Sequence, residues 1–114
     1  MKKYKFVLKE NFETYIHELR LFKFIFTDKY GVTWGKIDHG YLTIKKGYAW
    51  NGCTIVPDTE QTYTASLLHD FGYQFHYAKR NVVDKIFHKQ LVEDKFRYAE
   101  IYYLGVRIFG GLFY

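Results

Sequence analysis

The chain has 114 residues, a length that allows one hydrophobic core and is too short for two domains. Hydrophobic residues make up 48 % and aromatic residues 22 %, which excludes a disordered chain. The formal net charge of +5 favours anionic partners such as nucleic acid, phospholipid head groups or an acidic protein surface. A merely soluble basic domain would carry the same charge.

The first half of the chain predicts antiparallel strands. Residues 3–9 alternate polar and apolar side chains, which is the period of a half-buried strand. Further apolar stretches, separated by short turn sequences, predict strands over residues 21–27, 32–37 and 41–45. Turns at such short spacing predict a β-meander. Residues 11–19 fit either a short helix or an irregular edge of the sheet.

Beyond Pro57 the apolar spacing changes to three and four residues, the period of a helix. Asp58 and Thr59 are suitable N-cap side chains for the first helix, and Gly110-Gly111 is a common stop for the last. Helices are predicted over about residues 61–77, 81–95 and 98–109. We therefore expect a single α+β domain, β-rich over about residues 1–57 and a three-helix unit over 58–114.

Cysteine content and hydropathy limit the compartment. Cys53 is the only cysteine, which excludes an intrachain disulfide and a metal site built on several cysteines. A small secreted domain is usually stapled by disulfides, so a reducing compartment or a virion is favoured. No apolar core of a signal peptide follows the basic N-terminus. The most apolar stretch, residues 101–114, is shorter than the roughly 20 residues that span a bilayer.

The pattern with the clearest chemical meaning lies on the first predicted helix. Because residues three and four apart share a helix face, His69, Tyr73 and His76 form one stripe and Asp70 points further round. Asp84, on the second predicted helix, lies at the margin of an apolar stripe, where an unpaired charge would be costly. If the two helices pack antiparallel, Asp84 faces His69 and leaves the second imidazole nitrogen as a base. Asp70 is then free to bind a hard cation.

Each of these residues also has an ordinary structural explanation. A histidine at the border of a helix face is often a hydrogen-bonded, partly buried side chain, and an aspartate near a helix start is often a dipole contact. His88 follows Asp84 by one turn, so these two residues could instead bind a metal together with His69. A functional site is favoured by the combination of His-Asp, a tyrosine four residues after the histidine, and an aspartate on the next helix.

The sequence Leu67-Leu68-His69-Asp70-Phe71-Gly72-Tyr73, followed by Val83-Asp84-x-x-Phe87, resembles the catalytic helix pair of phospholipase A2, especially in its bacterial and parvoviral members. The resemblance covers about residues 65–91. It implies that His69 is the general base that activates water and that Asp84 orients it. It also implies that Tyr73 supports the site and that Asp70 binds calcium.

A wider resemblance covers nearly the whole chain. Residues 46–57, then His69-Asp70-x-x-Tyr73, then Asp84, and then Val106-Arg107-Ile108-Phe109-Gly110 are similar to a phage and prophage family filed as domain of unknown function 1353. Asn51 stands where aspartate is common in that family, and Cys53-Thr54 replaces Ala-Ser. The resemblance implies a phage-encoded protein in the virion or the host cytoplasm, with no established activity.

The calcium loop of phospholipases is rich in glycine, and the nearest candidate here, residues 50–54, has one glycine. Asn51 would offer a neutral oxygen, and the backbone of Gly52 could approach an ion or an oxyanion closely. A turn that leaves the sheet explains the same Asn-Gly pair without any ligand, and such a turn could still line the site.

Two functions are therefore expected from the sequence. The first is a phage-associated hydrolase of lipids or other esters, with His69, Asp84 and Tyr73 as catalytic residues and Ca²⁺ held by Asp70, Asn51 and Gly52. The alternative is a non-enzymatic virion or assembly protein that uses the helix pair as a scaffold with a buried hydrogen-bond network. Expected partners are a phospholipid or other anionic surface and phage structural proteins; no specific nucleic-acid signal is present.

Overall fold

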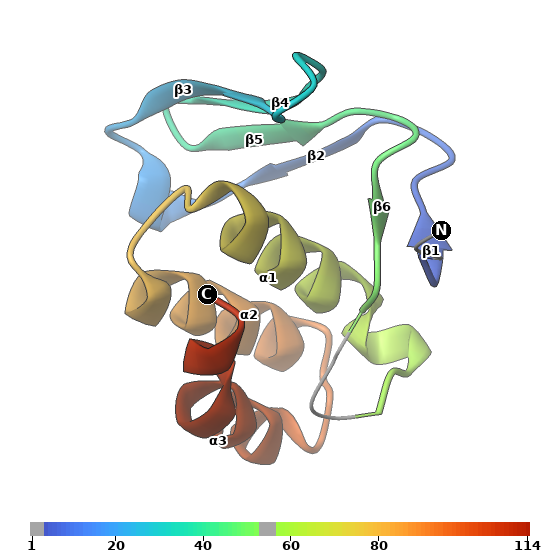
Figure 1. Ribbon diagram of the computed structural model, residues 1–114. Helices are drawn as coiled ribbons and strands as arrows, with labels where there is room; N and C mark the ends of the chain where they lie inside the picture. The colour runs from blue at the N-terminus through green and yellow to red at the C-terminus, as the bar shows by residue number, and fades with distance from the viewer. Residues whose placement is uncertain (1–3, 53–56) are drawn as a thin grey trace. The chain divides into compact units, whose positions relative to one another are not determined.

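The protein is of the α+β class, as predicted, with N-terminal strands followed by three helices (Figure 1). The computed structural model describes residues 4–52 and 57–114. The chain divides into two compact units, Met1–Trp50 and Asn51–Tyr114, which are described separately below. Within the described residues, no helix is both long enough and apolar enough to cross a membrane.

The first unit contains a four-stranded antiparallel sheet with the strand order β2-β5-β4-β3. β3 (Lys23–Thr27), β4 (Thr33–Asp38) and β5 (Tyr41–Ile44) form the predicted meander, close to the predicted bounds. β2 (Phe12–Tyr15) pairs with β5 on the far side of the meander, with Phe12 opposite Ile44. The meander therefore consists of β3, β4 and β5, and β2 joins it by pairing with a strand that is not its neighbour in the sequence.

Residues 11–19, for which the sequence allowed a helix or an edge, contain both a strand and a helical turn. β2 ends at Tyr15, and His17–Leu19 form a 3₁₀ turn. Gly40 packs closely against this segment. Its φ of +89° favours glycine, and a Cβ at this position would lie only 3.0 Å from the carbonyl oxygen of Ile16. Leu19 is fully buried, so an apolar contact holds the turn in place.

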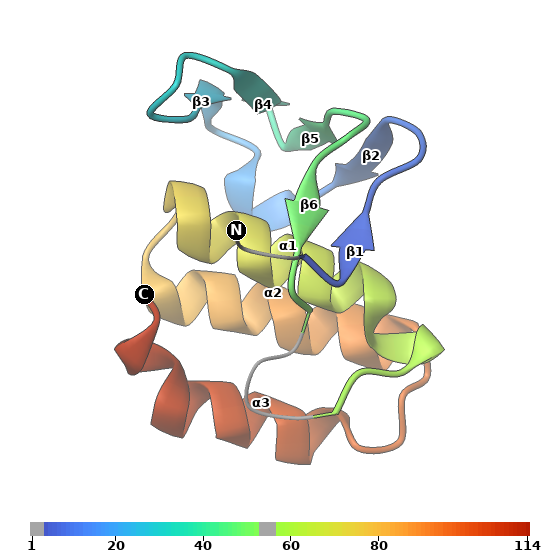
Figure 2. The same ribbon diagram turned by 45° about the vertical axis from the view of Figure 1, so that its right-hand side comes forward.

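A separate two-stranded ladder pairs β1 (Phe6–Val7) with β6 (Ala49–Trp50) (Figure 2). Among the described residues the predicted strand over 3–9 is correct only for Phe6 and Val7, and β6 was not predicted. The rings of Phe6 and Trp50 stack with centroids 5.3 Å apart. This ladder depends on two segments far apart in the sequence, which explains why local periodicity did not reveal its extent.

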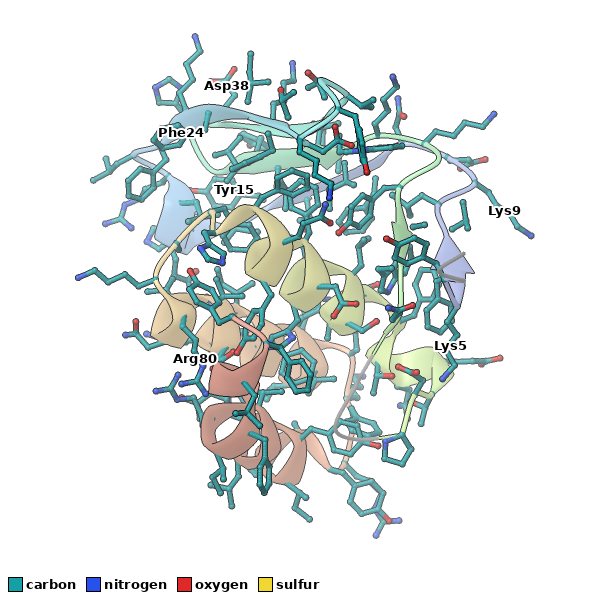
Figure 3. The ribbon with its side chains drawn as sticks, viewed as in Figure 1. Lys5, Lys9, Tyr15, Phe24, Asp38 and Arg80 are labelled. Atoms are coloured by element: carbon teal, nitrogen blue, oxygen red, sulfur yellow. The ribbon has the colours of Figure 1, made fainter. Side chains whose placement is uncertain are left out.

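The four-stranded sheet has one buried and one exposed face. Its buried residues are Phe26, Gly35, Ile37, Leu42 and Ile44, and along β4 and β5 they alternate with more exposed positions. Charged side chains occupy exposed positions of this unit, as at Lys9 and Asp38, which project away from the ribbon (Figure 3).

The second unit consists of α1 (Tyr63–Phe75), α2 (Arg80–Glu93) and α3 (Ala99–Phe109). Consecutive helices run antiparallel, with α2 between α1 and α3 (Figure 2). A 3₁₀ turn, Glu60–Thr62, precedes α1, and the backbone N–H of Thr59 donates to Thr62 Oγ1 at 2.8 Å. α1 ends before the predicted residue 77 because His76 adopts a left-handed conformation, with φ +50°.

One core joins the three helices. Its buried side chains are Ala65, Phe87, Leu91, Phe96, Ala99, Tyr102 and Val106. α1 and α2 approach closely at Gly72, where an added Cβ would lie 2.6 Å from Val83 Cγ1 and 2.8 Å from Tyr77 Cζ. This close, antiparallel approach brings His69 of α1 opposite Asp84 of α2.

Candidate active site

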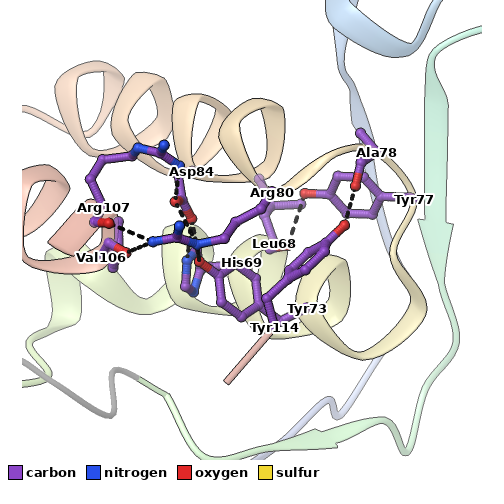
Figure 4. A network of polar contacts seen from close by, with 10 residues as sticks. All are labelled: Leu68, His69, Tyr73, Tyr77, Ala78, Arg80, Asp84, Val106, Arg107 and Tyr114. Atoms are coloured by element: carbon purple, nitrogen blue, oxygen red, sulfur yellow. Dashed lines mark hydrogen bonds and ion pairs between the residues drawn. The ribbon is translucent and has the colours of Figure 1, made fainter. Parts of the chain in front are cut away.

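Asp84 lies at the centre of a polar network that links the three helices (Figure 4). Its side chain is fully buried, deeper than the helix margin predicted from the sequence. One carboxylate oxygen accepts hydrogen bonds from His69 Nε2 at 2.9 Å and from the Tyr73 hydroxyl at 2.7 Å. The other accepts from Arg107 Nη1 at 2.9 Å and lies 3.7 Å from Arg80 Nε. The predicted contact between His69 and Asp84 is confirmed.

The protonation of Asp84 determines the tautomer of His69. Burial by itself raises the pKa of Asp84, but hydrogen bonds from His69, Tyr73 and Arg107 outweigh it and lower the pKa below its ordinary value. Asp84 is therefore an ionised acceptor at neutral pH, so His69 Nε2 must carry the proton that it donates. In the neutral imidazole, the lone pair is then on Nδ1.

His69 Nδ1 is the open nitrogen of the ring. It has no hydrogen-bond partner among the described residues, and the side chain is 13 % exposed. Among the described residues, no fully buried side-chain nitrogen or oxygen lacks a partner, so Nδ1 keeps some solvent-accessible surface. Tyr73 and Phe87 pack on the ring with centroids 4.1 and 4.8 Å away, which holds its orientation. An oriented imidazole with one open lone pair is suited to general base catalysis.

Tyr73 connects Asp84 to Arg80. Its hydroxyl donates to Asp84 and accepts a hydrogen bond from Arg80 Nε at 3.3 Å. Burial, together with the hydrogen bond to the negative charge of Asp84, raises the pKa of Tyr73 well above its ordinary value. Tyr73 therefore stays protonated and serves as a donor. The structure places it beside the predicted dyad; its catalytic role is a prediction.

Two arginines that the sequence analysis did not assign to the site complete the network. Arg80 donates through Nη2 to the backbone carbonyls of Val106 at 2.8 Å and Arg107 at 2.5 Å, so it binds the C-terminal end of α3. The spacing of Arg80 one turn before Asp84 is visible in the sequence and could have predicted this pair. Arg107 lies on another helix, and no local pattern predicts its contact with Asp84.

The end of α3 is shaped to admit these side chains. Gly110 is buried, and a Cβ at this position would collide with the Tyr73 hydroxyl and lie 3.4 Å from Arg80 Nη2. Gly111 is similarly close to the Arg80 guanidinium, with 3.5 Å to Nη1. The Gly-Gly pair predicted only as a helix stop therefore also makes room for the network.

Asp70 lies outside the Asp84 network, as its helix position predicted. Its Oδ2 accepts a hydrogen bond from the backbone N–H of Gly52 at 3.1 Å, so the structure brings Asp70 and Gly52 together, with Asn51 next in the chain. Gly52 has φ +79°, which agrees with the interpretation of Asn51-Gly52 as a turn. The remaining residues of that predicted loop, Cys53 and Thr54, lie outside the described residues.

Among the described residues, the oxygen donors around Asp70 are fewer than a complete calcium shell needs. Ca²⁺ takes about six to eight oxygen ligands, usually from several carboxylates. Here one carboxylate is present, and one of its oxygens already accepts the Gly52 amide. Between residues 4–52 and 57–114, no three His, Cys, Asp or Glu side chains are grouped to hold a metal.

The other histidines of the helical unit lie outside the site. His88 does not join Asp84 as a metal ligand: its Nε2 contacts Glu100 Oε1 at 2.6 Å instead. His76 stacks on Tyr114, with ring centroids 4.0 Å apart and an interplanar angle of 5°. Tyr114 also packs edge-on against Tyr73, and its hydroxyl donates to the carbonyl of Ala78. Tyr114 therefore packs against the end of α1 and the connection between α1 and α2.

Comparisons of the chain with family models, with curated proteins and with solved structures found no match. The resemblances to the phospholipase A2 helix pair and to the phage family stay hypotheses. The class that fold and site define is an α+β protein with a buried aspartate and a partly exposed histidine.

Proposed function

We propose that the protein is a phage-associated hydrolase in which His69 activates water for attack on a carboxylic ester. The observation that supports the proposal is the asymmetry of the His69 ring: Nε2 is bound to the buried Asp84 carboxylate and Nδ1 is open to solvent. The substrate class suggested by the resemblance to phospholipase A2 is a phospholipid ester.

In the proposed reaction, Nδ1 of His69 takes a proton from water while the water oxygen bonds to the carbonyl carbon of the ester. Asp84 stabilises the imidazolium that results, and Tyr73 and Arg107 hold the carboxylate in place. The bond between the acyl carbon and the ester oxygen then breaks, and the imidazolium returns its proton to the leaving alkoxide. The products are a carboxylic acid and an alcohol. No step is assigned to calcium, because the described donors do not complete its shell.

A second candidate function is a non-enzymatic virion or assembly protein, and one observation favours it. Asp84 faces two arginine side chains as well as His69, so its charge is shared among several donors. Such sharing weakens the stabilisation of an imidazolium and suits a buried network that specifies how three helices pack. In this alternative, His69 is a structural hydrogen-bond donor.

A paired measurement on His69→Gln and His88→Gln separates the two functions. His88 is a matched control because it lies in the same helical unit and outside the Asp84 network. The assay is release of fatty acid from vesicles of phosphatidylglycerol and phosphatidylcholine, with calcium and with a chelator, together with thermal melting. We expect His69→Gln to reduce hydrolysis by roughly 10²–10⁴-fold with little change in melting, because that is the contribution of a positioned base. His88→Gln should retain activity.

The scaffold alternative predicts the reverse result. Wild-type protein would release no fatty acid from these vesicles or from a soluble aryl ester. His69→Gln would lower the free energy of unfolding by about 1–3 kcal/mol, because Asp84 would lose a hydrogen-bond donor. That combination would overturn the hydrolase proposal.

A further inference from the structure

α3 is apolar on its outer face as well as on its inner face. Ala99, Tyr102 and Val106 are buried in the three-helix core, whereas Ile101, Leu104 and Ile108 are 64 %, 58 % and 61 % exposed. These three residues are spaced three and four apart and form a stripe that continues to Leu112, which is 83 % exposed. A helix that is apolar on both faces is expected to be covered on both.

We propose that this stripe, defined by Ile101, Leu104, Ile108 and Leu112, is the interface with a second copy of the chain, packed antiparallel across a two-fold axis. The inference does not rest on the proposed hydrolase activity. It rests on the symmetry of the stripe, on the charges beside it, and on the exposed apolar area of α3 and the turn that follows.

The part of the stripe from Ile101 to Ile108 is self-complementary about its centre. Leu104 and Gly105 lie at the middle, with Ile101 three residues before Leu104 and Ile108 three residues after Gly105. A two-fold axis through this centre places Ile101 of one copy against Ile108 of the other, twice. Gly105 has no side chain, which permits close approach of the two helix backbones.

The bordering charges favour the antiparallel orientation. Glu100 and Arg107 lie on the same edge of the stripe, nearly two turns apart. An antiparallel pair places Glu100 of each copy near Arg107 of the other, whereas in a parallel pair this edge would face the opposite edge of the partner helix and the two residues would not meet. Both residues already have internal partners, His88 and Asp84, but their side chains are 79 % and 34 % exposed and can make a second contact.

The area and the charge of this unit favour a second copy over a lipid surface. The exposed apolar side chains that the helix and the following turn present are Ile101, Leu104, Ile108, Phe109, Leu112 and Phe113. Together they expose on the order of 600 Å², close to the roughly 800 Å² that each partner contributes to a standard interface. Residues 51–114 contain seven Lys and Arg and seven Asp and Glu, so this unit has no net charge to attract anionic lipid.

The first test is the oligomeric state of the full chain in solution. We expect wild-type protein to sediment as a dimer at submillimolar concentration and to dissociate on dilution into the low micromolar range. Leu104→Lys should be monomeric throughout and should keep the circular dichroism spectrum of the wild type. Leu21→Lys is the control, because Leu21 is 81 % exposed but belongs to the other unit; it should remain dimeric.

A second test addresses the orientation, using single cysteines in a Cys53→Ser background. A mixture of Ile101→Cys and Ile108→Cys proteins should form several-fold more covalent dimer under mild oxidation than either protein alone. In an antiparallel pair, two copies of residue 101 are separated by about 10 Å along the helix axis, too far for a disulfide. Equal yields from Ile101→Cys alone and from the mixture would overturn the antiparallel arrangement.

Two results would overturn the proposal as a whole. One is a wild-type protein that stays monomeric at every concentration, including the case in which it binds phosphatidylglycerol vesicles and Leu104→Lys does not. The other is a Leu104→Lys protein that dimerises as well as the wild type. Neither result depends on whether the protein hydrolyses esters.

Discussion

Asp28 in the sheet unit and Asp84 in the helical unit accept similar numbers of hydrogen bonds in opposite settings. Asp28 lies in the turn between β3 and β4 and accepts from the backbone N–H groups of Tyr30 and Val32 and from Trp34 Nε1. All of its partners lie within six residues. Asp84 is fully buried and takes its partners from three helices.

The comparison shows how the two units use a carboxylate. Water can replace a lost partner of Asp28, which is partly exposed, so its role is to shape a local turn. No water is available to Asp84 at full burial, so each of its donors must come from the fold. A buried carboxylate such as Asp84 therefore links the packing of the three helices to the orientation and protonation of His69. The variants below compare it with the partly exposed Asp28.

The largest expected effect is on the free energy of unfolding after Asp84→Asn. This change removes the charge but keeps the shape, and it leaves Arg80 and Arg107 without their buried counter-ion. We expect a loss of about 3–5 kcal/mol, measured by chemical denaturation, because breaking a buried ion pair from one side is costly. Asp28→Asn should cost much less. Equal losses in the two variants would refute the distinction between the aspartates.

The second prediction concerns acid. The pKa of Asp84 is lowered in the folded protein, so the folded state binds fewer protons than the unfolded state near the ordinary carboxyl pKa of about 4. The stability from Asp84 is therefore complete above that value and is lost as the pH falls through the lower, folded pKa. The stability difference between wild type and Asp84→Asn should stay constant from neutral pH down to about pH 5 and shrink as the pH falls below about 4. A difference that is independent of pH would show that the charge of Asp84 contributes nothing.

A smaller loss in the free energy of unfolding is expected from Gly72→Ala. This change pushes α1 away from α2 without altering the polar groups around Asp84, so it separates the effect of helix packing from that of the charge. The added Cβ would meet Val83 and Tyr77 in a packed core. We expect a loss of about 1–3 kcal/mol from overpacking. Lys85→Ala, at an exposed position of α2, is the control and should be nearly neutral. An unchanged Gly72→Ala protein would mean that the close helix approach is not required.

Some features of the helical unit follow from local sequence patterns, and others do not. The approximate helix bounds followed from apolar spacing, because both helices are long and phased by residues three and four apart. The His69–Asp84 contact followed from the same phasing together with antiparallel packing of the two helices. Full burial of Asp84 did not follow, because α3 covers it and the angle of α3 is set by distant core residues such as Phe96 and Val106.

The smallest expected effect is on calcium binding at Asp70, a third aspartate whose setting lies between those of Asp28 and Asp84. With one carboxylate beside Gly52, the dissociation constant should be no better than about 10⁻⁴ to 10⁻³ M. Calorimetric titration of wild type should show this weak binding, which Asp70→Asn removes and Glu60→Gln, at an exposed position, retains. Heats that are equal in wild type and Asp70→Asn would exclude Asp70 as a ligand.

The sequence by itself determined the α+β class, the three helices and the strands of the meander, and it placed His69 and Asp84 on faces that meet if the two helices pack antiparallel. Each of these depends on neighbours within one or two turns or on strand alternation, which the order of residues contains directly. Only the tertiary structure decided the pairing of β1 with β6 and of β2 with β5, and the contact of Arg107 with Asp84. These contacts join segments far apart in the chain, and their register is set by how whole elements pack, which local periodicity does not specify.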